Sequence, residues 1–85
     1  PVHVLIIPKE HFESFNDVTP QIMQKMTTFI QSVAKTLNID ENGYRLITNI
    51  GENGGQEVPH LHFHMLGGAQ LKWGHFTDAD PKDFF

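Results

Sequence analysis

This chain of 85 residues contains no cysteine, so neither disulfide bonds nor thiolate metal ligands can stabilise it. It has no apolar stretch approaching the roughly 20 residues that a helix needs to cross a bilayer. No signal peptide is visible, because the short apolar start leads directly into charged residues. We therefore expect a protein without membrane contacts, located in the reducing cytoplasm.

Basic residues are also few, with 6 Lys and Arg against 10 Asp and Glu and a net charge of -4. Because the charges are scattered and the balance is acidic, we do not expect a nucleic-acid-binding surface built on phosphate neutralisation. A chain this short buries little surface by itself. Partner subunits are the remaining source of buried area.

Three segments have the composition of strands. Val2–Ile7 is rich in β-branched residues, and its almost wholly apolar composition predicts an interior strand covered on both faces. Tyr44–Ile50 and His60–Leu66 are predicted as two more strands. The glycine-rich loop Gly51–Gln56 between them favours an antiparallel hairpin.

One helix is predicted between the first two strands. Thr19 and Pro20 supply an N-cap hydroxyl and a proline at the first helical position, and the helix is expected to run to about Leu37. Its apolar positions recur at steps of three and four: Ile22, Met23, Met26, Phe29, Ile30, Val33, Ala34 and Leu37. The element order predicts an α+β fold, an antiparallel sheet with one long amphipathic helix packed on one face.

Three histidines alternate with apolar residues along the last predicted strand. Because successive side chains of a strand point to opposite faces, His60, His62 and His64 are expected on one face, about 6–7 Å apart. The apolar residues between and after them would pack on the helix. By contrast, we expect His3 and His75 to be ordinary polar residues.

Two kinds of chemistry suit this histidine face. A metal could bind a His-x-His pair, with a third ligand from Glu57, His11 or another chain. Alternatively, a neutral imidazole could attack phosphorus and form a covalent intermediate. The glycines of the loop Gly51–Gln56 let backbone N–H groups approach an anion, so phosphate chemistry is favoured over a bare metal site.

The pattern His-φ-His-φ-His-φ-φ, with φ apolar, is met by residues His60 to Leu66 and resembles the histidine-triad (HIT) superfamily, specifically its Hint branch of nucleoside phosphoramidases. The resemblance extends to Val4–His11, Gly43–Asn49, Gly54–Val58 and Gly67–Trp73. It covers residues 1–73, which we interpret as the C-terminal two-thirds of a HIT domain, followed by a tail at 74–85.

The resemblance implies a role for each matching residue. His62 would be the nucleophile that attacks the α-phosphate, and His64 would contact the phosphate and assist the leaving group. His60, with His11 near it, would orient the site. The substrate-binding residues would be Asn49, Gly55, Gln56, Glu57, His62, His64 and Trp73.

The implied activity is cleavage of purine nucleoside 5′-phosphoramidates or adenylated conjugates through a nucleotidyl-histidine intermediate. The implied partners are a purine nucleotide of the AMP or GMP type and a second copy of the chain, which docks through the helix and the Tyr44 strand. No cofactor is expected. A dinucleoside polyphosphate hydrolase is the enzymatic alternative, and a nucleotide- or zinc-binding module without turnover is the other.

The family's N-terminal third, a helix and a hairpin that hold the base and ribose, has no counterpart in this sequence. The chain starts within an apparent strand and without an initiator methionine, so we expect Pro1 to be internal to a longer protein. Some relatives hold a structural zinc through two upstream cysteines and histidines at the His11 and His60 positions. This chain has no cysteines, so such a site cannot close within it, although a region upstream of Pro1 could supply them.

Overall fold

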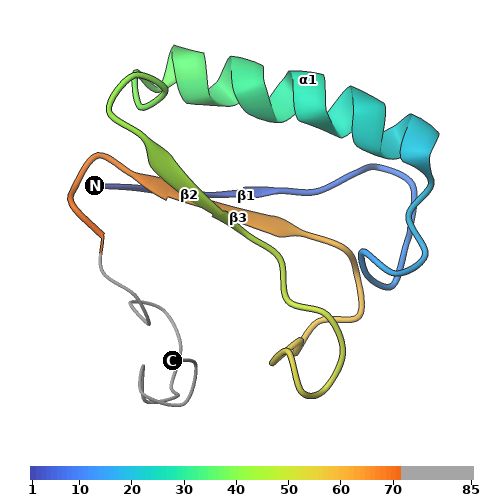
Figure 1. The fold of residues 1–85 in the computed structure, drawn as a ribbon. Helices are drawn as coiled ribbons and strands as arrows, with labels where there is room; N and C mark the ends of the chain where they lie inside the picture. The colour runs from blue at the N-terminus through green and yellow to red at the C-terminus, as the bar shows by residue number, and fades with distance from the viewer. Residues whose placement is uncertain (72–85) are drawn as a thin grey trace.

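The computed structural model describes residues 1–71, in which one helix lies across one face of a three-stranded sheet (Figure 1). The elements, in chain order, are β1 (Val2–Ile6), α1 (Pro20–Thr36), β2 (Tyr44–Ile47) and β3 (Phe63–Gly67). This arrangement confirms the predicted α+β fold. Within the described part, no helix is long and apolar enough to cross a membrane. Trp73 and the predicted tail lie outside the described residues, so the boundary at residue 73 stays a prediction.

β3, the last of the described strands, lies in the middle of the sheet, with the order β1-β3-β2 and both pairings antiparallel. The predicted pairing of β2 with β3 is therefore confirmed, although the connection between them runs through residues 48–62. The register places Leu5 and Ile47 on either side of His64. The central position brings β1, from the start of the chain, and β2, from its middle, to the two sides of the histidine strand.

Both paired strands are shorter than predicted. β2 ends at Ile47 rather than Ile50, and β3 begins at Phe63 rather than His60. The strand pairing that was predicted but is absent lies next to the glycine-rich loop. Hydrogen bonds of the loop and of side chains hold the chain there instead. His62 therefore precedes β3 instead of belonging to it.

β1 differs from the predicted interior strand. In the described sheet it lies at an edge, and its residues alternate in exposure. Ile6 is buried on the helix side, whereas Leu5 and Ile7 are 55% and 51% exposed. The prediction of a strand covered on both faces is therefore wrong for residues 1–71, because apolar composition alone does not distinguish a covered strand from an edge strand.

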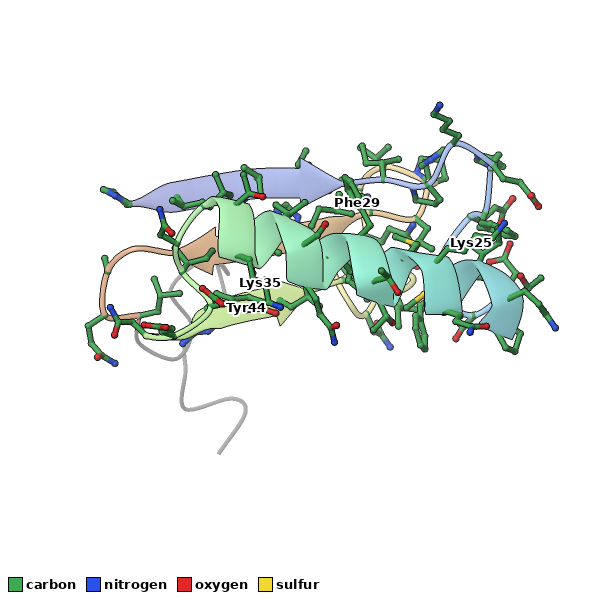
Figure 2. The ribbon with its side chains drawn as sticks, turned by 90° about the horizontal axis from the view of Figure 1, so that it is seen from above. Lys25, Phe29, Lys35 and Tyr44 are labelled. Atoms are coloured by element: carbon green, nitrogen blue, oxygen red, sulfur yellow. The ribbon has the colours of Figure 1, made fainter. Side chains whose placement is uncertain are left out.

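The helix begins as predicted. The Thr19 hydroxyl accepts a hydrogen bond from the Ile22 N–H at 3.2 Å, and Pro20 occupies the first turn, where its missing N–H costs nothing. Phe29 is the exception to the predicted apolar stripe, being 56% exposed. At 100° per residue it lies about 100° around the helix from Ile30, the middle of the three buried residues of α1, and Figure 2 shows it on the side of α1 nearer β1.

The core lies between α1 and the sheet, and β2 contributes to it through the partly buried Tyr44. Its buried members are Ile6, Phe12, Met26, Ile30, Ala34, Ile39, Leu61, Phe63 and Met65. The three residues that alternate with the histidines all belong to this list. Burying them fixes the direction of the histidines, because a strand that points one set of side chains into a core must point the other set away from it.

Candidate active site

The structure confirms the prediction that the histidines and the apolar residues between them point to opposite faces. Leu61, Phe63 and Met65 are 1%, 6% and 0% exposed. His60, His62 and His64 are half-buried. The imidazoles therefore share the face of the sheet opposite α1.

The residues just before β3 lie outside the strand ladder and are held by other hydrogen bonds. The Leu61 N–H donates to the Phe12 carbonyl at 2.7 Å. The Thr48 hydroxyl donates to the His62 carbonyl, also at 2.7 Å. These two bonds hold the middle histidine in place, so Thr48 is a positioning residue that sequence reasoning missed.

The His62 ring is oriented by the backbone of its own segment. Its Nδ1 lies 2.7 Å from the His60 carbonyl oxygen. Because a carbonyl oxygen only accepts, Nδ1 carries the proton, and the neutral ring has its lone pair on Nε2. An imidazole nitrogen with a free lone pair is a competent nucleophile.

His64 contacts both the nucleophile candidate and a histidine from β1. Its ring meets that of His62 edge-on, with centroids 5.3 Å apart. Its Nδ1 lies 2.9 Å from Nε2 of His3. Burial lowers the pKa of His64 below its ordinary value, and the positive charge that His3 or His62 can carry lowers it further. His64 is therefore mainly neutral near pH 7.

His3 joins the site although its sequence context predicted an ordinary polar residue. Its register partner is Leu66, two residues beyond His64, and residues two apart on a strand share a face. The chain offers no local signal for this contact, because the paired positions are 61 residues apart.

His11 lies against His60, as the resemblance implied. Their Nδ1 atoms are 3.0 Å apart, and Nε2 of His60 lies 3.4 Å from the Pro8 carbonyl oxygen. A proton on Nε2 of His60 suits this carbonyl and leaves its Nδ1 to accept a hydrogen bond from His11.

The same pair does not complete a metal site with the residues present. Within residues 1–71, no three His, Cys, Asp or Glu side chains form a group that could hold an ion. A structural zinc usually takes four ligands, whereas His11 and His60 supply two and the chain has no cysteine. The described residues therefore do not fit the structural zinc site that the resemblance raised.

The Gln56 side chain, predicted to line the phosphate, instead makes hydrogen bonds to other groups of the protein. Its Oε1 accepts from the Gly51 N–H at 2.9 Å. Its Nε2 donates to the carbonyls of Glu13 and Val58, at 2.5 and 3.0 Å. The carboxamide thus fastens the glycine-rich loop to the segment after β1, which leaves backbone groups and neighbouring residues to face a substrate.

The other predicted substrate-binding residues lie around the same loop. Asn49 donates through Nδ2 to the Gly54 carbonyl at 2.7 Å. Gly55 has a φ of 76°, which a side chain would disfavour. Gly55, Gln56 and Glu57 share one open hollow of about 470 Å³ with Gly51, Glu52 and Pro59.

Comparison with known proteins agrees with this geometry. The HIT domain family model matches residues 1–71. A HIT-like protein of Helicobacter pylori is 55% identical over 67 residues, which cover 79% of this chain and 64% of that protein. The purine nucleoside phosphoramidase of Escherichia coli K12 is 45% identical over 74 residues, 84% of this chain and 62% of that enzyme.

A solved structure shows the same fold. The HIT family hydrolase from Clostridium thermocellum superposes with a TM-score of 0.77 at 48% identity, over 85% of this chain and 65% of that one. This chain spans about 64% of the length of the first of these relatives. From the family match, the identities and the superposition together, the chain belongs to the HIT domain family.

Proposed function

We propose that this chain carries the catalytic part of a hydrolase or transferase that cleaves purine nucleoside 5′-phosphoramidates or related adenylated conjugates. The observation that carries the proposal is the 2.7 Å contact between Nδ1 of His62 and the His60 carbonyl, which leaves Nε2 free to attack. The 45% identity to the E. coli purine nucleoside phosphoramidase supports the substrate class.

In the proposed reaction, Nε2 of His62 forms a bond to the α-phosphorus, and the bond from phosphorus to the leaving amine breaks. The amine takes up a proton from His64, whose lowered pKa makes it a ready donor once protonated. Water then attacks the α-phosphorus, and the bond from phosphorus to Nε2 of His62 breaks, which releases the nucleoside monophosphate and restores the free imidazole. The proton that the water loses passes to His64, which the contact with His3 would hold in place.

The remaining histidines and the loop would prepare the site. The His11–His60 pair would hold the backbone carbonyl that orients His62. Asn49 and the loop around Gly55 would face the ribose and phosphate, with Glu57 near the leaving group. No step needs a cofactor. We further propose a homodimer in the cytoplasm, where nucleotide conjugates are formed.

The test is release of AMP from adenosine 5′-phosphoramidate by the wild type and by His62→Ala. Loss of a covalent nucleophile should lower kcat by several orders of magnitude while leaving ground-state binding of AMP largely intact. Glu10→Gln, at an exposed position outside the histidine contacts, serves as a control and should keep the wild-type rate.

Two outcomes would contradict the proposal. Binding of AMP without turnover by the wild type would favour a nucleotide-binding module. Preferential cleavage of diadenosine polyphosphates over the phosphoramidate would favour the alternative function, a dinucleoside polyphosphate hydrolase.

A further inference from the structure

The chain contains two Asn-Gly pairs in exposed turns, Asn42-Gly43 and Asn53-Gly54. In such a pair the backbone nitrogen of glycine can attack the side-chain amide carbon of asparagine. The reaction is favoured before glycine because no side chain hinders the nitrogen or restricts the backbone angles it needs. Whether it occurs in a folded protein depends on whether that nitrogen is free.

The fold engages one of the two glycine nitrogens. The Gly43 N–H donates to the Ile39 carbonyl at 3.0 Å, in the turn that follows α1. Attack by this nitrogen on Asn42 requires that hydrogen bond to break. The fold therefore protects the first pair.

The second pair, Asn53-Gly54, lies in a turn that is closed by the N–H of the next residue rather than by the N–H of Gly54. The Gly55 N–H donates to the Glu52 carbonyl at 3.0 Å, which leaves Asn53 and Gly54 as the two central residues. Among the described residues, the Gly54 N–H has no hydrogen-bond acceptor. Asn53 is exposed, so water can reach its amide.

We propose that Asn53-Gly54 is a site of spontaneous deamidation, and that it reacts well before Asn42-Gly43. The Gly54 nitrogen loses its proton to solvent base and bonds to Cγ of Asn53, and the Cγ–Nδ2 bond breaks to release ammonia. The five-membered succinimide then takes up one water. Opening at Cγ leaves aspartate at position 53, and opening at the main-chain carbonyl leaves isoaspartate.

The two products affect the loop differently. Isoaspartate adds one carbon to the main chain just before Gly54, whose carbonyl accepts the 2.7 Å hydrogen bond from Asn49. The space there is tight, since a Cβ on Gly54 would lie 2.3 Å from the Ile50 carbonyl oxygen. Isoaspartate should therefore displace Asn49, whereas plain aspartate should leave the backbone in place. The consequence for activity rests on the proposed function.

The modification is measured by ageing the folded protein at mildly alkaline pH and mapping its tryptic peptides. Residues 36–45 and 46–72 fall in separate peptides, one for each pair. Deamidation adds about 1 Da to a peptide, and fragmentation assigns it to a residue. We expect Asn53 to react at least about fivefold faster than Asn42, as expected from one additional hydrogen bond to break.

Unfolding in urea is the matched control, because it removes the Gly43 hydrogen bond and should bring the two rates together. Equal rates in the folded protein, or faster reaction at Asn42, would overturn the proposal. So would a rate difference that persists in urea, since it would come from local sequence rather than from the fold.

Two variants test whether deamidation of Asn53 lowers the activity, and whether isoaspartate rather than the new charge is the cause. Asn53→Gln should keep its activity during ageing, because glutamine cyclises far more slowly. Asn53→Asp carries the charge on a normal backbone and should keep more activity than the aged wild type. Activity should fall in proportion to the isoaspartate fraction, and full activity in a converted sample would overturn the predicted effect on the site. If the protein has no activity before ageing, the proposed function is contradicted. The peptide masses would still show whether Asn53 deamidates faster than Asn42.

Discussion

His64 is kept mainly neutral by its surroundings, and His3 is one of the groups responsible. Burial is the largest cause of its lowered pKa, followed by the charges that His3 and His62 can carry. The 2.9 Å contact with His3 places a positive charge on that ring close enough to disfavour protonation of His64.

We predict that His3→Gln raises the pKa of His64 toward its ordinary value of 6.5 without reaching it, because burial remains. The measurement is a pH titration of the His64 ring by NMR. The control is His11→Gln, which removes a histidine that contacts His60 instead. An unchanged midpoint in His3→Gln, or an equal shift in the control, would contradict the assigned cause.

The same shift makes folding depend on pH. Since the pKa of His64 is lower in the folded protein than in the unfolded chain, the unfolded chain binds this proton first as the pH falls. The fold should therefore lose stability as the pH drops through 6.5 toward the folded pKa. Above that range, His64 contributes no pH dependence.

At the scale of elements, side-chain hydrogen bonds stabilise two loops of the site, the segment after β1 and the glycine-rich loop. In the segment after β1, the Asp17 carboxylate accepts from the backbone N–H groups of Glu13 and Ser14 at 3.1 and 3.0 Å, which lowers the pKa of Asp17. Gln56 then joins this segment to the glycine-rich loop through the Glu13 carbonyl. The two loops are therefore joined to each other through Gln56.

We predict that Gln56→Glu destabilises the protein by about 1–3 kcal/mol, the cost of leaving carbonyl groups without their donor. Glutamate keeps an oxygen for the Gly51 N–H but offers no N–H to Glu13 or Val58. The free energy of unfolding in urea measures the loss. Gln24→Glu makes the same change on the exposed side of α1 and should stay within about 0.5 kcal/mol of the wild type. Equal stabilities of the two variants would show that Gln56 does not join the loops.

For the whole molecule, β2 is one of the two strands, with β1, that have an unpaired edge in the described sheet. It is an edge strand of the described sheet, and Leu46 is 41% exposed although it lies level with the buried Met65 on the helix-facing side. An edge strand with an apolar side chain beside it suits pairing with a second copy across a two-fold axis. This geometry supports the proposed homodimer.

Leu46→Asp should therefore shift the protein from dimer toward monomer, because the two-fold axis would bring two new carboxylates close together. Sedimentation velocity over a range of concentrations measures the change. Phe29→Asp is the matched control, since Phe29 is also exposed but lies on the side of α1 nearer β1. A wild-type monomer, or equal dissociation by both variants, would contradict the proposed interface.

The sequence by itself determined the elements whose signals are local. The Thr19 cap, the helical period and the alternation between Leu61 and Met65 each depend on residues a few positions apart, and each predicted a feature that the structure confirms. The ends of β2 and β3 were not predictable in this way. They depend on where Thr48 and the Phe12 carbonyl bond to the histidine segment.

Only the tertiary structure decided which groups meet at the site. His3 reaches His64 across 61 positions of sequence, and Gln56 reaches Glu13 across 43. The first contact follows from the central place of β3 beside β1, and the second joins two loops. No local pattern encodes either of them. The sequence thus determined that three histidines share a face, and the strand order determined that His3 joins them.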